Sequence, residues 1–112
     1  MIEIILKDYL EKALDVPVLL EVPQNPPESY ILIDKTGSSG RVHNIQTATV
    51  AIQSYAPSML LAAELNEKVK DAMEMLVILP TVSRSELNTD YNFADTQRKL
   101  YRYQAVFDIV HY

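Results

Sequence analysis

The sequence has no cysteine and only two glycines among its 112 residues. Without cysteine the chain can form no disulfide, offer no thiolate nucleophile and hold no metal through sulfur. Both glycines lie in Gly37-Ser38-Ser39-Gly40, which is expected to be a mobile loop. This segment lacks the Gly-x-x-x-x-Gly-Lys-Ser/Thr pattern of a phosphate-binding loop, and no serine of the chain lies in a nucleophile-elbow pattern.

A long apolar run is also missing. The longest runs, Met59–Ala63 and Met75–Leu79, are far shorter than the roughly 18 residues that a membrane-spanning helix needs. The first residues carry an acid where a signal peptide would carry bases, and their apolar run is too short for one. We therefore expect a soluble protein that is made inside the cell and has no membrane partner.

A surplus of positive charge is absent too, because the net charge is −5. Phosphate neutralisation supplies most of the affinity of nucleic-acid binders, so specific DNA or RNA binding is not expected. The one basic cluster, Arg98, Lys99 and Arg102, is too small to bind nucleic acid alone. It could contact an acidic partner surface, or it could be the solvated edge of a strand.

No set of residues forms a catalytic or metal site. His43 and His111 have no second ligand at helical or strand spacing and are interpreted as surface residues. Asp90 and Asp95 could form a carboxylate pair, but their Asn- and Thr-rich surroundings favour solvated turns. We therefore expect no enzymatic activity, no metal and no cofactor.

What is present is a succession of periodic segments. Two helices are predicted, over 2–14 and from Pro57-Ser58 to about Leu79, because apolar residues recur at helical spacing and proline follows each segment. The apolar stripe of the second helix comprises Leu61, Leu65, Val69, Ala72, Met73 and Leu76.

Strands are predicted over 18–22, 30–35, 45–55 and 99–112, with one or two short ones within 81–95. We expect the strand at 30–35 to pair antiparallel with 45–55, and the strands within 81–95 to begin a hairpin with 99–112. The whole chain, 1–112, is then a single α+β domain. It has a mostly antiparallel sheet of about four to five strands with two helices packed on it.

The last strand is long and bears Tyr101, Tyr103 and Tyr112. If it lies at the edge of the sheet, it needs an assembled partner to prevent aggregation, and tyrosines are common at interfaces. If it lies at the centre, its tyrosines belong to the core. The sequence leaves both arrangements open.

Several short strings, spread over essentially the whole length, resemble the small tail terminator (tail completion) proteins of long-tailed bacteriophages with non-contractile tails. The first are Val16-Pro17-Val18, Glu21-Val22-Pro23 and Asn25-Pro26-Pro27. Further along come Gln53-Ser54-Tyr55-Ala56-Pro57-Ser58, Ala62-Ala63-Glu64-Leu65 and Arg102-Tyr103-Gln104-Ala105-Val106-Phe107. Residues 81–97 depart from the family pattern.

The resemblance implies a structural subunit of the virion, made in the bacterial host cytoplasm. Such proteins assemble with themselves into a ring, usually a hexamer, on the end of the tail tube. The ring binds the tail tube protein, stops tube polymerisation and presents a surface to the head-completion or connector protein, while DNA passes through its lumen. Two alternatives remain, a head–tail adaptor of the neck and a small-molecule-binding accessory domain of a cellular protein.

The expected contact surfaces are the segment 37–44 and residues 84–98, because both are polar and long. Exchange of Arg41 and Arg98 for glutamate is expected to impair tail completion without unfolding the chain. The candidate assembly-interface residues are Lys35, Arg41, His43, Asn44, Tyr91, Phe93, Arg98 and Arg102.

Overall fold

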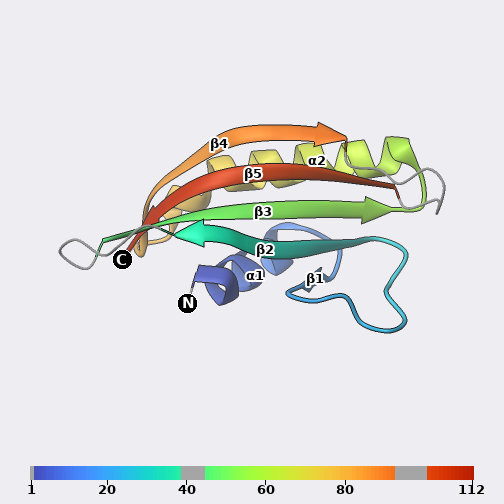
Figure 1. Cartoon of the computed structure of the whole chain (residues 1–112), viewed down its shortest axis with the longest axis horizontal. Helices are drawn as coiled ribbons and strands as arrows, with labels where there is room; N and C mark the ends of the chain where they lie inside the picture. Colours follow the sequence, from blue (N-terminus) through green and yellow to red (C-terminus); the bar gives the residue numbers. More distant parts are fainter. Residues whose placement is uncertain (1, 39–44, 93–100) are drawn as a thin grey trace.

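The computed structural model describes residues 2–38, 45–92 and 101–112. They form two helices, a short 3-10 helix and five strands (Figure 1). The elements follow in the order α1 (Ile2–Ala13), β1 (Val18–Leu19), β2 (Tyr30–Ser38), β3 (Gln46–Ala56), α2 (Met59–Glu74), η1 (Leu76–Ile78), β4 (Val82–Asn92) and β5 (Tyr101–His111). The predicted α+β class is confirmed.

The strands form one sheet in the order β1-β2-β3-β5-β4. Only β1 and β2 run parallel, and the other three pairs are antiparallel. The predicted pairing of 30–35 with 45–55 and the predicted hairpin with the last strand are both confirmed. β1 is shorter than the predicted strand 18–22, because only Val18 and Leu19 reach β2.

The core lies between the helices and one face of the sheet. α2 packs mainly on β3 and β5, whereas α1 packs on β1 and β2 (Figure 1). Alternate residues of each strand supply this face, as the period of two requires. The core residues are Ile2, Leu6, Leu10, Leu14, Val18, Ile31, Ile33, Ala48, Val50, Ile52, Leu65, Val69, Met73, Leu76, Val82, Ala105, Phe107 and Ile109.

The last strand, β5, is central, since it pairs with β3 on one side and β4 on the other. The edge alternative is therefore wrong, but the tyrosines are not core residues either. Tyr101 and Tyr103 are half-buried, and Tyr112 is exposed. The long edge strand is instead β4, a single strand of 11 residues in a region for which one or two short strands were predicted.

Two further predicted boundaries are wrong. β2 continues through Gly37 and Ser38, which keep pairing with β3 beyond a register shift after Lys35, so these two residues are not in a loop. α2 ends at Glu74, well before Pro80. After that residue the backbone changes to hydrogen bonds that span three residues instead of four, and these form η1. One of them joins the Ile78 N–H to the Met75 carbonyl at 3.1 Å.

The beginning of α2 is fixed by Ser58, whose side chain accepts a hydrogen bond from the Leu61 N–H at 3.2 Å. Leu61 itself is 47% exposed, so its predicted place in the buried stripe is wrong. Ala62 takes that place, and one residue along a helix turns the side chain by about 100°. No helix in the described ranges is long and apolar enough to cross a membrane.

Candidate assembly interface

The face of the sheet opposite the helices, called the open face below, is covered by no helix of the described chain. Strand register assigns its residues, because each pair across a ladder shares a face. They are Tyr30, Leu32, Asp34, Thr47, Thr49, Ala51, Gln53, Tyr55, Arg84, Glu86, Thr89, Tyr91, Arg102, Gln104, Val106, Asp108 and Val110.

One chain of hydrogen bonds crosses three strands on this face. Arg102 Nη1 donates to the Tyr55 hydroxyl at 3.1 Å, and that hydroxyl donates to Gln53 Oε1 at 2.7 Å. Gln53 Nε2 donates to Gln104 Oε1 at 2.8 Å, and Gln104 Nε2 donates to the Tyr91 hydroxyl. All four bonds run in the same direction, so each polarises the next. The side chains are thereby ordered before any partner binds, which lowers the entropic cost of binding.

A second polar row lies nearer the other end of the same face. Both oxygens of Asp108 accept hydrogen bonds, one from Thr49 Oγ1 and one from Asn88 Nδ2, each at 2.9 Å. This row again joins β3, β5 and β4. A side chain held from both neighbouring strands adds rigidity to the open face.

Two stacked aromatic rings lie at one end of the open face. The rings of Tyr30 and Tyr55 are stacked with centroids 4.4 Å apart and planes at 9°. The guanidinium carbon of Arg102 lies 5.7 Å from the Tyr55 centroid. Burial, and next the proximity of Tyr55, raise the pKa of Tyr30 above its ordinary 10.0, while Arg102 lowers it in part.

This shift gives a pH-dependent prediction for Tyr30. The pKa of Tyr30 is higher in the folded chain than its ordinary value in the unfolded chain. The stability that its neutral hydroxyl contributes is therefore fully present below the ordinary pKa and is lost as the pH rises through the folded pKa. From about pH 9 to about pH 11, the wild-type free energy of unfolding should therefore fall more than that of Tyr30→Phe. Urea unfolding at each pH measures the difference.

The Tyr30→Phe variant keeps the stacked ring and removes only the titrating hydroxyl. Tyr9, whose pKa is also raised by burial, titrates equally in both proteins and cancels from the comparison. Parallel pH profiles for the two proteins would contradict the prediction.

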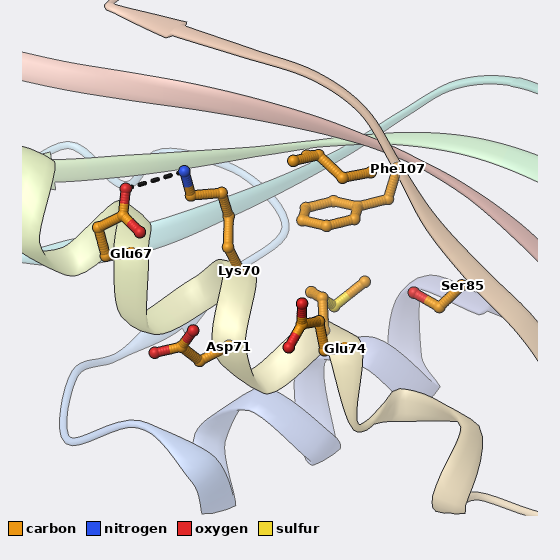
Figure 2. A pocket seen from close by; sticks show the side chains of 8 residues that line it. Glu67, Lys70, Asp71, Glu74, Ser85 and Phe107 are labelled. Carbon is orange, nitrogen blue, oxygen red and sulfur yellow. Dashed lines mark ion pairs between the residues drawn. The ribbon is translucent and has the colours of Figure 1, made fainter.

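A polar hollow of about 260 Å³ lies on the other side of the sheet, between α2 and β4 (Figure 2). Figure 2 shows Glu67 and Lys70 meeting at one side, Ser85 at the other and the Phe107 ring between them. The hollow is smaller than most ligand pockets, which measure about 300–1,000 Å³. Its wall residues are Glu67, Lys70, Asp71, Met73, Glu74, Ser85, Leu87 and Phe107.

Lys70 connects α2 to the edge strand above this hollow. Its Nζ lies 2.8 Å from Glu67 Oε1 and 2.9 Å from Asp90 Oδ2, and these two partners raise its pKa above the ordinary 10.5. Asp90 Oδ2 also accepts from Nδ2 of the buried Asn66 at 3.1 Å. Asp90 is therefore a structural anchor, and its interpretation as a solvated turn residue is wrong. Asp95 lies outside the described residues.

His111 is buried, so its interpretation as a surface residue is wrong. It pairs with Gln46 and Val82 on the helix-facing side of the sheet, and its Nδ1 lies 3.2 Å from the Tyr112 carbonyl oxygen. His43 lies outside the described residues. Within residues 2–38, 45–92 and 101–112, no three His, Asp or Glu side chains gather as a metal site would require.

Three of the eight predicted interface residues can be placed. Tyr91 and Arg102 share the open face and stand at opposite ends of its hydrogen-bond chain. Lys35 is exposed on β2, and its side chain belongs to the helix-facing side. The other five, which lie outside the described residues, are Arg41, His43, Asn44, Phe93 and Arg98.

Sequence reasoning missed the polar residues that connect the strands, above all Gln53, Gln104 and Asp108. Their only sequence signal is alternation, since each occupies the polar side of a strand whose other side is apolar. Alternation assigns a face but does not indicate which side chains stand opposite one another on neighbouring strands.

Compared with protein-family models and with curated proteins, the chain matches none. The resemblance to the tail terminators therefore stays a prediction based on the short strings quoted above.

Proposed function

We propose that this chain is a structural subunit of a phage tail, a terminator that assembles as a ring on the end of the tail tube. The observation that carries the proposal is the open face, which presents an ordered polar surface that no helix of the described chain covers. Rigid, partly polar surfaces with tyrosine and arginine are typical of protein interfaces.

The proposal also names the binding partners of the ring and its location in the virion. The ring, of six copies in the family that the sequence resembles, would contact the tail tube protein on one side and a head-completion protein on the other. It belongs to the neck end of the virion tail and needs no cofactor. The net charge of −5 suits a lumen through which DNA passes without being bound.

The experiment is the removal of this protein from the phage or prophage that encodes it. We expect tails that run on beyond their normal length or that lack heads, because growth of the tube is no longer stopped. Electron microscopy of negatively stained particles measures the distribution of tail lengths. A stop codon at position 30 is the suitable change, because it removes the protein and leaves the neighbouring genes in place.

Expression of the intact chain from a plasmid should restore the normal length, and expression of the interrupted gene should not. Tails of normal length that fail to attach to heads would instead favour a neck adaptor. Normal particles in the absence of the protein would contradict both functions.

A further inference from the structure

The two edges of the sheet differ in how much of each is paired. β4 forms one edge over its full length, and no described strand pairs with its outer side (Figure 1). The other edge belongs to β1, which covers β2 only at Ile31 and Leu32. β2 continues to Ser38 beyond that cover, so six residues, 33–38, have no strand on their outer side within the described chain.

The backbone of β2 offers hydrogen-bonding groups at this uncovered edge. Residues of a strand alternate in the direction of their N–H and C=O groups. The Ile31 N–H donates to the Pro17 carbonyl at 2.9 Å, so the backbone groups of Ile31, Ile33 and Lys35, which precede the register shift, point away from β3. The N–H and C=O of Lys35 consequently face the outer side, beyond the last residue that β1 covers.

The two edges also run in compatible directions. β2 is antiparallel to β3, β3 to β5 and β5 to β4, so β4 runs opposite to β2 within one molecule. A second copy placed beside the first in the same orientation brings its β4 antiparallel to the first copy's β2. We propose that copies of this chain associate head to tail in this way, with β4 of one extending the sheet of the next at residues 33–38.

The position of β1 sets the register. Asn92 at the end of β4 can approach no further than Ile33, because β1 occupies the edge at Leu32. Antiparallel counting from that limit places Tyr91 opposite Asp34 and Asp90 opposite Lys35. The first pair lies on the open face and the second on the helix-facing side, so both pairs match in face.

Charge supports the same register. It places the Lys35 ammonium beside the Asp90 carboxylate, and opposite charges directly across a ladder stabilise strand pairing. Among the described residues, Asn66 and Lys70 both donate to Oδ2 of the Asp90 carboxylate, and neither of them contacts Oδ1. Asp34 is exposed and meets Tyr91, which is 41% exposed.

Head-to-tail pairing uses two different edges, so it is heterologous and produces either a closed ring or an open filament. The closed ring rests on the proposed function, whereas the edge pairing rests on the strands alone.

Engineered cysteines test the pairing cleanly, because the native chain has none. In Asp34→Cys/Tyr91→Cys, an intramolecular disulfide is excluded, since three strand spacings of about 4.8 Å separate the two positions and bridged Cα atoms lie within about 7 Å. Oxidation at rising protein concentration should convert this variant into a ladder of covalent multimers on non-reducing gels. A mixture of the two single variants should stop at dimers.

The matched control is Asp34→Cys/Glu86→Cys, which keeps both cysteines on the open face but displaces one along β4. It should cross-link far less than the test variant. Three results would each overturn the proposal. They are equal cross-linking of the test and control variants, dimers formed by Tyr91→Cys alone (as a symmetric β4–β4 pair would give), and the absence of cross-links at any concentration. Tail lengths report on the function separately: cross-links with normal tails in the absence of the protein would retain the pairing and reject the function.

Discussion

Replacement of Phe107 by alanine is expected to lower the free energy of unfolding by about 3–5 kcal/mol. The Phe107 ring is 2% exposed and belongs to the core between the sheet and α2. Its removal loses the transfer free energy of the ring and leaves a cavity beside the hollow in Figure 2. Since a domain of this size has only about 5–15 kcal/mol of stability, the effect should be easily measured by urea unfolding.

The neighbouring residue provides the control. Val106 is half-buried on the open face, so Val106→Ala should cost only about 1 kcal/mol. The comparison tests the assignment of faces along β5 directly. Similar costs for the two substitutions would show that the helices do not cover the Phe107 side of the strand.

The second large effect is expected for Asp90→Ala, which should cost about 2–3 kcal/mol. Asp90 accepts from the buried Asn66 and from Lys70, and thereby fastens the edge strand β4 to α2. Without it, the Asn66 amide loses the hydrogen-bond partner of its Nδ2, and its Oδ1 has no partner within the described residues that could compensate. Thermal or urea unfolding followed by circular dichroism measures the cost.

Glu67→Ala is the matched control, because it removes the other carboxylate that binds Lys70. The Glu67 side chain is 67% exposed, so its ion pair should contribute about 0–1 kcal/mol. A second check is the double variant Asn66→Ala/Asp90→Ala, whose cost should be less than the sum of the single costs. Additive costs, or equal costs for Glu67 and Asp90, would contradict the anchoring role of Asp90.

These two experiments also bear on the proposed edge pairing. Asp90 holds the part of β4 that the pairing requires, and it stands opposite Lys35 of the neighbouring copy in the proposed register. Asp90→Ala should therefore reduce cross-linking of the cysteine variant, whereas Glu67→Ala should leave it unchanged.

The helical period and the alternation of apolar residues were sufficient to predict the segments 2–14, 45–55 and 99–112, which form α1, β3 and β5. These patterns are local, since they arise from side chains that must reach one core from a regular backbone. The end of α2 was predicted less well. Pro80 marks a position that the helix cannot pass. The α-helix nevertheless ends before Pro80, because the backbone from Met75 onward forms the tighter turns of η1.

β4 illustrates a different limit. Its residues are polar and mostly exposed, so the sequence has little apolar alternation to reveal an 11-residue strand. Pairing with β5 creates that strand, and β5 is far more regular. The wrong interpretation of Asp90 has the same origin, because its partners Asn66 and Lys70 are distant in the sequence.

The sequence by itself determined the fold class, the positions of α1, β3 and β5 and the lack of any cysteine chemistry, because composition and local periodicity do not depend on which distant segments meet. Only the tertiary structure decided that β5 is central and β4 an edge, that Gln53 and Gln104 meet, and that no described strand pairs with β2 beyond β1. Strand order and cross-strand contacts depend on which distant segments pair, and a local pattern assigns a side chain to a face without naming the strand beside it.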